Sequence, residues 1–549
     1  AEVFSVKLKD AIRTMLFRNK PAGFNQLLTR WGRELNPDYV LPEYPRPQLR
    51  RSNYEILNGY WNYTITEGDK WPDSYEGKIL VPFSPESVLS GVNRQLKPGQ
   101  TLWYERELVI SQIHWNMRCI LHFGAVDQSC IVYLNKQPVG GHTGGYLPFS
   151  IDITKYLKCG VNLLTVRVTD QTDCSCHSRG KQKLKRGGMF YTAQSGIWQT
   201  VWMEWVPQLY ISSLRITPLM DENLVRIELF MNEDFDSINP DNLCFRACIY
   251  DKGRLLASAS SRLPVIEIPF SNYIPWTPEN PQLYDLVISV GEDIIESYFA
   301  MRQVRIQKDE KGIDRIYLNG KVYFQKGLLD QGYWPDGLYT APADEAMIYD
   351  IMKAKEMGFN MLRKHLKIEP LRWYYHCDRL GMLVWQDMVN GGGKYNSLLV
   401  GYLPTLFPCF ASCIKDHHYR CFGRKNAECR AEWLRECEKT VELLYNHPSI
   451  VVWVLFNEGW GQFDAAKAYE MVKSLDAGRL VDHASGWFDQ GCGDFKSIHN
   501  YFHPLKIKKH KYPVVLSEYG GYAYYVKGHS YSMKIYGYRR FFSRKDFIR

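Results

Sequence analysis

The sequence lacks any long hydrophobic run: no apolar stretch in its 549 residues approaches the roughly 18 that a membrane-spanning helix requires. Near the N-terminus, Lys7, Lys9 and Arg13 interrupt the apolar segment that a secretory signal would need. No cofactor fingerprint is present either. We therefore expect no cofactor, no membrane partner and a cytoplasmic location. Because the first residue is Ala rather than Met, a processed N-terminus stays open.

The cysteines show no zinc-binding pattern. Most of the 14 Cys stand singly among apolar residues, as Cys119, Cys130 and Cys377 do, which predicts buried free thiols and a reducing compartment. Two groups combine Cys with His: Cys174-Ser175-Cys176-His177, and Cys413 with His417, His418 and Cys421. Neither group has the paired spacing of a structural zinc site, so we expect no bound metal.

A strong local excess of charge with a recognition motif is also absent. The net charge of +9 is spread over a long chain. Its basic runs, Arg179–Arg186 and Lys506–Lys511, lie beside no nucleic-acid-binding motif. We interpret both runs as solvated loops and expect no nucleic-acid partner.

Aromatic residues, by contrast, are abundant: 16 Trp, 37 Tyr and 25 Phe make up 14% of the chain. Their flat faces suit the C–H faces of sugars, but aromatic rings also fill hydrophobic cores, and composition alone favours the core. At about 100–200 residues per domain, the length predicts three or four domains.

The first part of the chain is typical of β structure that follows an N-terminal arm. Residues 1–50 predict the arm, with helix-like spacing between Ala11 and Leu16 and then a proline-rich extended segment. Over 51–206, short alternating strands separated by turn residues predict a β-sandwich or jelly roll. Residues 207–303, again with period-two strands, predict a small immunoglobulin-like sandwich.

From residue 304 to 549 strands alternate with helices. The strands are rich in Val, Ile and Leu, as strands buried on both faces are, and the order predicts a (β/α)8-type TIM barrel. The strand candidates are Tyr323–Leu329, Asn360–Lys364, Leu383–Gln386, Ile450–Phe456, Leu480–His483, Ser497–Asn500 and Val514–Ser517. The helix candidates are Asp344–Met357, Glu369–Leu380, Arg430–Tyr445 and Asp464–Leu475. No eighth strand is evident before Arg549, so the barrel is predicted to be C-terminally incomplete.

Two carboxylates stand where buried strands of this barrel stop, which is where catalytic side chains of such barrels lie. Glu458 follows the apolar run Ile450–Phe456, and Glu518 follows Val514–Leu516. One such Glu could merely complement a helix dipole. Two that face one cavity can hydrolyse a glycoside, because one protonates the leaving oxygen while the other attacks the anomeric carbon. Burial and mutual repulsion would keep the acid protonated while Glu518 stays ionised.

A series of short motifs runs in order through nearly the whole chain. They are Tyr44-Pro45-Arg46-Pro47, Leu57-Asn58-Gly59-Tyr60-Trp61, Gly144-Gly145-Tyr146, Phe149-Ser150-Ile151-Asp152, Ser195-Gly196-Ile197-Trp198-Gln199, Asn360-Met361-Leu362-Arg363-Lys364-His365, Val384-Trp385-Gln386-Asp387, Phe456-Asn457-Glu458 and Ser517-Glu518-Tyr519-Gly520-Gly521. In order and spacing together they resemble the family 2 glycoside hydrolases, which include β-galactosidases, β-glucuronidases and β-mannosidases.

The resemblance implies a retaining β-glycosidase that works through a covalent glycosyl-enzyme, with Glu458 as acid/base and Glu518 as nucleophile. It also implies that Asn457 binds the 2-hydroxyl of the sugar and that Tyr501 hydrogen-bonds the nucleophile. Further candidates for contact with the sugar stand at or beyond other strand ends, with packing in the barrel core as the alternative for each. They are His365, Asp387, His499 and Trp487.

The resemblance is incomplete after the nucleophile, where family members add an eighth strand. Three explanations stay open: a fragment of a longer gene, which we favour, a strand supplied by a partner chain, or an inactive remnant. No Asn-x-Lys element of the kind that reads a glucuronide carboxylate follows Glu518, so we predict a neutral, β-galactoside-like substrate. The alternative function is a truncated, inactive carbohydrate-binding protein. A homo-oligomer also stays open.

Overall fold

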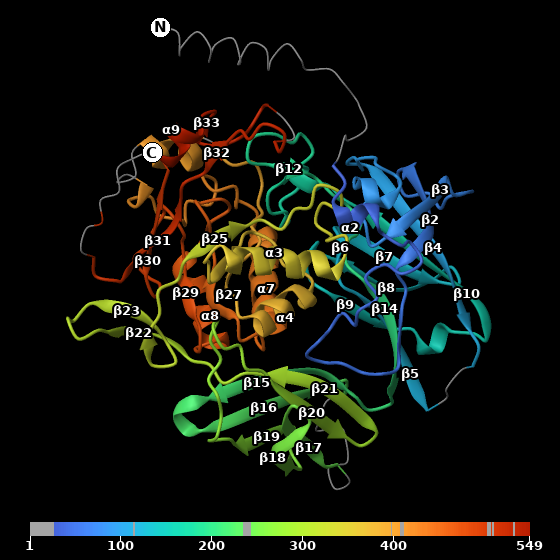
Figure 1. The fold of residues 1–549 in the computed structure, drawn as a ribbon. Helices are drawn as coiled ribbons and strands as arrows, with labels where there is room; N and C mark the ends of the chain where they lie inside the picture. Colours follow the sequence, from blue (N-terminus) through green and yellow to red (C-terminus); the bar gives the residue numbers. More distant parts are fainter. Residues whose placement is uncertain are drawn as a thin grey trace.

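The computed structural model describes residues 27–112, 116–233, 243–396, 398–406, 411–501, 507, 510–530 and 533–549. Two β-sandwiches lie against a larger strand–helix unit (Figure 1). The helix-like spacing between Ala11 and Leu16 lies outside the described residues. None of the described helices is both long and apolar enough to cross a membrane.

The first sandwich consists of a six-stranded sheet, ordered β3-β2-β4-β10-β7-β8, and a four-stranded sheet, ordered β1-β14-β5-β9. Alternation explains the strands: in β7, Cys130, Val132 and Leu134 point into the core while their neighbours are half exposed. Short pairs, β6 with β13 and β11 with β12, lie at its end. The strands are β1 (Tyr54–Ile56), β2 (Gly59–Glu67), β3 (Gly77–Val81), β4 (Gln100–Ile110), β5 (Met117–Phe123), β6 (Val126–Asp127), β7 (Ser129–Leu134), β8 (Gln137–Thr143), β9 (Phe149–Asp152), β10 (Gly160–Thr169), β11 (Gln182–Lys183), β12 (Tyr191–Thr192), β13 (Gly196–Ile197) and β14 (Val201–Pro207).

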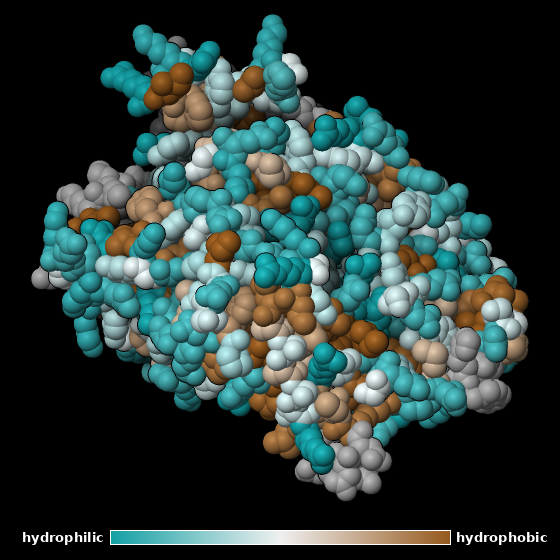
Figure 2. All heavy atoms as spheres, turned by 60° about the horizontal axis from the view of Figure 1, so that its bottom comes forward, coloured by the Kyte–Doolittle hydropathy of each residue, from teal (hydrophilic) through white to brown (hydrophobic). Residues whose placement is uncertain are grey.

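The second sandwich packs a three-stranded sheet, β15-β16-β19, against a four-stranded one, β18-β17-β20-β21, around its own apolar core. Its strands are β15 (Ile211–Leu219), β16 (Leu224–Met231), β17 (Phe245–Asp251), β18 (Arg254–Ser261), β19 (Val265–Pro269), β20 (Tyr284–Val290) and β21 (Asp293–Phe299). On the face of the molecule that carries this sandwich, hydrophilic side chains predominate and hydrophobic ones lie in small groups (Figure 2).

The strand–helix unit begins after an antiparallel sheet of β22 (Val304–Lys308), β23 (Asp314–Leu318) and β24 (Lys321–Val322). Parallel pairing joins five strands in chain order: β25 (Gly327–Asp330), β26 (Met361–Lys364), β27 (Leu383–Asp387), β28 (Ile450–Val454) and β29 (Leu480–Asp482). A second parallel pair consists of β30 (Lys496–Asn500) and β31 (Val514–Tyr519). The helices are α3 (Asp344–Glu356), α4 (Leu371–Leu380), α5 (Leu403–Leu406), α7 (Ala427–Leu444), α8 (Ala465–Leu475) and α9 (Arg544–Ile548), with a π-helix at Leu398–Tyr402.

Each strand and helix predicted for this unit is present, with somewhat different ends. Among the described residues, β32 (Tyr522–Tyr524) and β33 (Arg539–Phe541) pair with each other and with no strand of the parallel sheets. The incompleteness of the barrel stays a prediction, and so do the zone boundaries after residues 50, 206 and 303.

The proline-rich arm connects the three parts. After the short helix α2 (Arg30–Arg33), Arg46 and Tyr44 both hydrogen-bond the buried carboxylate of Glu204 in β14. The side-chain amide of Gln48 donates to the carbonyl of Asn446, just beyond α7, at 2.9 Å. Arg51, immediately after the arm, binds Asp293 of the second sandwich through two 2.8 Å hydrogen bonds. The described part of the arm, residues 27–50, is therefore an integral part of the fold. Within the arm itself, the backbone of Arg50 forms an isolated β-bridge with Glu296 of β21.

The cysteines include one disulfide that the sequence did not predict. Cys119, Cys130 and Cys377 are buried free thiols as predicted. Cys176, however, forms a disulfide with Cys429 at the start of α7, across a sequence separation of 253. Sequence inspection missed the pair because its members lie in different parts of the fold. The disulfide also removes the argument for a reducing compartment that unpaired cysteines had offered.

Candidate active site

Glu458 and Glu518 lie where strands of the parallel sheets end. Glu458 follows β28 in a left-handed backbone conformation, with φ +53°, and its N–H donates to the carbonyl of Ser485 at 2.9 Å. Glu518 lies in β31, in register with His499 of β30. Each glutamate is only 9% exposed, so both carboxylates are largely shielded from water.

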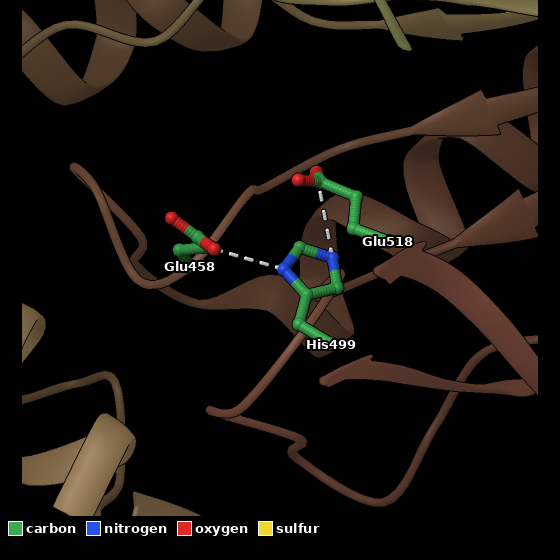
Figure 3. A group of neighbouring side chains, drawn as sticks. All are labelled: Glu458, His499 and Glu518. Atoms are coloured by element: carbon green, nitrogen blue, oxygen red, sulfur yellow. Dashed lines mark hydrogen bonds and ion pairs between the residues drawn. The ribbon is translucent and has the colours of Figure 1, made fainter. Parts of the chain in front are cut away.

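His499 lies between the two carboxylates (Figure 3). Its Nδ1 is 2.9 Å from Oε1 of Glu458, and its Nε2 is 3.5 Å from Oε1 of Glu518. The three side chains offer one atom each that all lie within 4.8 Å of one another. Such a group could also hold a metal ion, although the contacts with the histidine already join the two carboxylates.

Two side chains donate hydrogen bonds to the carboxylate of Glu518. Nη1 of Arg363 donates to Oε1 of Glu518 at 2.8 Å, and the hydroxyl of Tyr501 donates to Oε2. Burial alone would raise the pKa of Glu518, but His499 and Arg363 outweigh it and hold that pKa well below its ordinary value. Burial, together with the neighbouring carboxylates, raises the pKa of Tyr501, so its hydroxyl keeps the proton that it donates.

Asp387 at the end of β27 organises the groups around Glu518. Its carboxylate accepts from Nε and Nη2 of Arg363, at 2.8 and 3.1 Å, and contacts Nδ1 of His365 at 2.6 Å. Nη2 of the same arginine donates to Oδ1 of Asn457 at 2.9 Å. Arg363 thus fixes the carboxylates of Asp387 and Glu518 and the amide of Asn457 relative to one another.

Trp487 forms one side of the surroundings of His499, which it meets edge to face with ring centroids 5.8 Å apart. It belongs to an aromatic group that includes Trp460. The backbone N–H of Trp460 donates to the carbonyl of Asn457 at 3.0 Å. Phe190, from the first sandwich, stacks on Trp460 at 5.5 Å. The aromatic rings that composition assigned to cores therefore also stand beside the carboxylates.

A loop of the first sandwich reaches the same region, which corrects the interpretation of Arg179–Arg186 as a solvated loop. Arg179 is 7% exposed, and its N–H donates to the carbonyl of Asn390, beyond β27, at 2.9 Å. The charge of Lys181 interacts with both Glu518 and Glu458. The second basic run, Lys506–Lys511, lies partly outside the described residues.

The predicted site residues come together. Arg363 joins Glu518, Asn457 and Asp387, and the latter contacts His365, while His499 links both glutamates and adjoins Trp487 and Tyr501. Two participants were missed. Arg363 stands at a strand end beside His365, a signal that could have identified it. Lys181 is distant in sequence from the barrel, so no local pattern marks it.

Three family models cover most of the chain in sequence. The sugar binding domain of glycosyl hydrolases family 2 matches residues 85–206, a second domain described as glycosyl hydrolases family 2 matches 209–302, and the TIM barrel domain of that family matches 314–546. The chain belongs to glycosyl hydrolase family 2. These matches confirm the resemblance derived from the motifs, and with it a multidomain β plus α/β fold.

The relatives of this chain are named for enzymes that act on different sugars. A protein of Formosa agariphila named "Putative beta-glucuronidase" is 28% identical over 461 residues, 76% of this chain and 50% of the relative. A beta-galactosidase of Priestia megaterium is 24% identical over 73% of this chain and 38% of the relative. The chain thus spans about half or less of these curated relatives. The structure of a beta-D-glucuronidase from Dictyoglomus thermophilum covers 90% of this chain with a TM-score of 0.69 at 19% identity, and 87% of that chain is matched.

Proposed function

We propose that this chain is a retaining β-glycosidase in which Glu518 is the nucleophile and Glu458 the acid/base. The observation that carries the proposal is the short spacing of the pair, with carboxylate oxygens within 4.8 Å of each other. Retaining enzymes hold their carboxyl groups about 5–5.5 Å apart, whereas inverting enzymes keep about 6.5–9.5 Å for a water molecule. The spacing therefore favours direct attack by a carboxylate on the sugar.

The partners of each glutamate support these roles. Arg363 and Tyr501 stabilise the ionised form of Glu518, as a nucleophile requires. Glu458 has His499 and the longer 3.5 Å contact with the hydroxyl of Tyr501 as its polar neighbours, which leaves it suited to carry and return a proton.

The first half of the reaction follows from these roles. Glu518 attacks the anomeric carbon and forms an ester, while the glycosidic C–O bond breaks and the leaving oxygen takes the proton of Glu458. Asn457, held by Arg363 at 2.9 Å, is placed to bind the 2-hydroxyl of the sugar. The fixed arginine keeps both groups in position throughout.

The second half reverses the direction of proton transfer. Glu458, now a carboxylate, removes a proton from water, and the resulting hydroxide displaces Glu518 from the anomeric carbon. The sugar leaves with its original β configuration, because two inversions give net retention. The sugar we predict is a terminal, β-galactoside-like unit.

A panel of aryl β-glycosides, with and without a chelator, tests the proposal. We expect turnover of at least one neutral hexoside that is unchanged by the chelator. Glu518→Gln should reduce kcat by at least about 10⁴-fold, because an amide cannot form the ester. Turnover by Glu518→Gln at the rate of the unmodified chain would contradict the assignment. Glycan binding without turnover of any glycoside would favour the inactive carbohydrate-binding alternative.

A further inference from the structure

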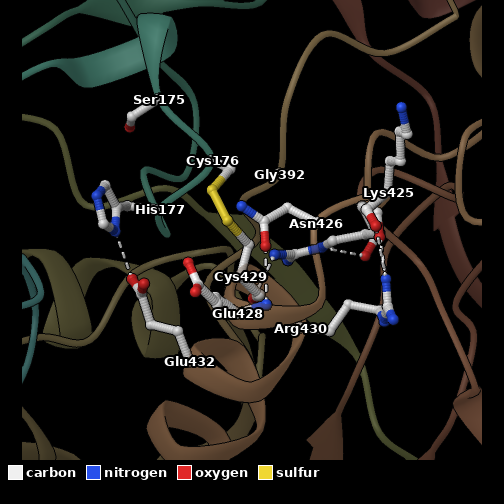
Figure 4. The surroundings of a disulfide bond; sticks show 12 residues. Ser175, Cys176, His177, Gly392, Lys425, Asn426, Glu428, Cys429, Arg430 and Glu432 are labelled. Carbon is white, nitrogen blue, oxygen red and sulfur yellow. Dashed lines mark hydrogen bonds and ion pairs between the residues drawn. A yellow bond between two sulfur atoms is a disulfide. The ribbon is translucent and has the colours of Figure 1, made fainter.

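The loop that contains Lys181 belongs to the first sandwich but is fixed to the strand–helix unit. Cys176 is disulfide-bonded to Cys429, and Nδ1 of His177 is 2.6 Å from Oε1 of Glu432 (Figure 4). Ser178 hydrogen-bonds Glu436 one turn further along α7. These contacts fasten the loop along one helix of the barrel.

The backbone of the loop then crosses the strand ends. The N–H groups of Arg179 and Gly180 both donate to the carbonyl of Asn390, at 2.9 and 3.2 Å. Gly180 has φ +61°, and a Cβ there would lie 2.6 Å from the carbonyl oxygen of Leu366, next to His365. Only glycine permits so close an approach. The residue before Lys181 is therefore held against the segments that follow β26 and β27.

The ammonium of Lys181 is near enough to the candidate site for its charge to act on several of the groups there. Its charge interacts with Glu518, Glu458, Arg363 and Asp387, which come from four different strands or strand ends. It is 5.8 Å from the ring centroid of Trp460. Within the described part of the chain, neither a hydrogen bond nor an ion pair engages this ammonium. Burial lowers the pKa of Lys181, as expected for a cation that lacks a close partner.

His365 offers the complementary group. Because the carboxylate of Asp387 can only accept, Nδ1 of His365 must donate to it. Burial and the charge of Lys181 lower the pKa of His365 well below its ordinary value, so the ring is neutral and Nε2 is an acceptor. This Nε2 is buried and has no hydrogen-bond partner among the described residues. A buried acceptor of this kind calls for a donor, which a bound ligand can supply.

We propose that Lys181 is a substrate-binding residue of the active site, and that its ammonium and Nε2 of His365 together bind one hydroxyl group of the sugar. A hydroxyl accepts from the ammonium through its oxygen and donates its hydrogen to the imidazole. A carboxylate has no hydrogen to give to Nε2. The inference rests on the proposed glycosidase function and refines it, since it assigns a specificity-determining role to a residue of the first sandwich.

The test uses the aryl hexoside that the unmodified chain hydrolyses fastest and its four monodeoxy analogues. Lys181→Met should lower kcat/KM for the parent about 10- to 100-fold, as expected for a lost hydrogen bond to a charged group. One monodeoxy analogue lacks the hydroxyl that Lys181 binds, so the unmodified chain should already have a lower kcat/KM for it than for the parent. On that analogue, Lys181→Met should lower kcat/KM by less than about threefold more. His365→Gln should show the same pattern: a lower kcat/KM for the parent, and little further loss on that monodeoxy analogue.

Lys183→Met is the matched control, because Lys183 lies two residues further along in β11 with its ammonium 3.8 Å from the ring of Phe190. It should keep the kcat/KM of the unmodified chain. An unchanged kcat/KM in Lys181→Met would overturn the inference, as would an equal loss on the parent and all four analogues. If the unmodified chain hydrolyses no glycoside, the proposed function itself fails.

Discussion

Glu458 occupies a backbone conformation that few residues other than glycine adopt, with φ +53°. Its N–H donates to Ser485, and the next residue, Gly459, also has a positive φ of +76°. The backbone therefore turns sharply after β28 and directs the carboxylate toward His499. Strained backbone of this kind is found preferentially at functional sites.

For Glu458→Ala the loss should depend on the leaving group. A good leaving group, such as dinitrophenolate, departs without a proton, whereas an alkoxide needs one. We expect kcat/KM to fall about 10³-fold or more for an alkyl glycoside and far less for the dinitrophenyl glycoside. Equal losses on both, measured with one sugar, would contradict the role of Glu458 as the acid.

Tyr501→Phe tests the stabilisation of the nucleophile. The hydroxyl of Tyr501 donates to Glu518, and a hydrogen bond to the charged form lowers a carboxyl pKa. Its removal should raise the pKa of Glu518, so the acidic limb of the kcat/KM profile should move to higher pH. A profile with an unmoved acidic limb would count against this contact. Tyr519→Phe, at an exposed neighbouring position, is the control.

Residue-level prediction from the sequence worked where a local pattern existed. Apolar runs such as Ile450–Phe456 identify buried strands, and the polar residues that follow these runs lie close together in the structure. The pattern did not reveal how Arg363 connects Asp387, Asn457 and Glu518, because those contacts depend on the distances between strands.

At the scale of elements, the loop that contains Cys176 shows what sequence periodicity leaves out. Strands and helices follow from their periods of two and 3.6 residues, as in β7 and α7. A loop has no period, and the position of Lys181 depends on docking against α7 and on the left-handed Gly180. The basic composition of this loop suggested solvent, whereas the structure brings it to the candidate active site.

The Cys176–Cys429 disulfide should contribute to stability, because it cross-links residues separated by 253 positions. Cys176→Ser with Cys429→Ser should reduce the free energy of unfolding by about 2–4 kcal/mol, seen as a lower Tm under non-reducing conditions. Cys159→Ser, which removes an exposed free thiol, is the control and should leave Tm unchanged. The account would be wrong if the double variant matched the unmodified chain.

At the scale of the whole molecule, the buried contacts of Glu204 connect the arm to the first sandwich. Arg46, Tyr44 and His122 all reach this carboxylate, and the first two belong to the arm. Burial opposes its ionisation, but Arg46 and His122 hold the pKa of Glu204 well below its ordinary value. The described part of the arm and the first sandwich are therefore expected to unfold together.

His122 makes this junction sensitive to pH. Burial and the charge of Arg46 lower the pKa of His122 to about 4, from about 6.5 in an unfolded chain. The unfolded chain therefore takes up a proton on this histidine at a higher pH than the folded chain does. The contribution of His122 to the free energy of unfolding is complete above about pH 6.5 and is lost as the pH falls to about 4. We expect Tm to decline over that window, and His122→Gln to decline less. His529→Gln, at an exposed position, should follow the unmodified chain.

The central claim is that Glu518 forms the covalent bond to the sugar, and one measurement tests it most directly. A 2-deoxy-2-fluoro β-glycoside with a good leaving group, built on the sugar that the chain hydrolyses, slows the second step and should trap the ester. Peptide mass spectrometry should then find one sugar per chain, attached to Glu518. A sugar attached to another residue, or hydrolysis with inversion and no trapped ester, would contradict the account.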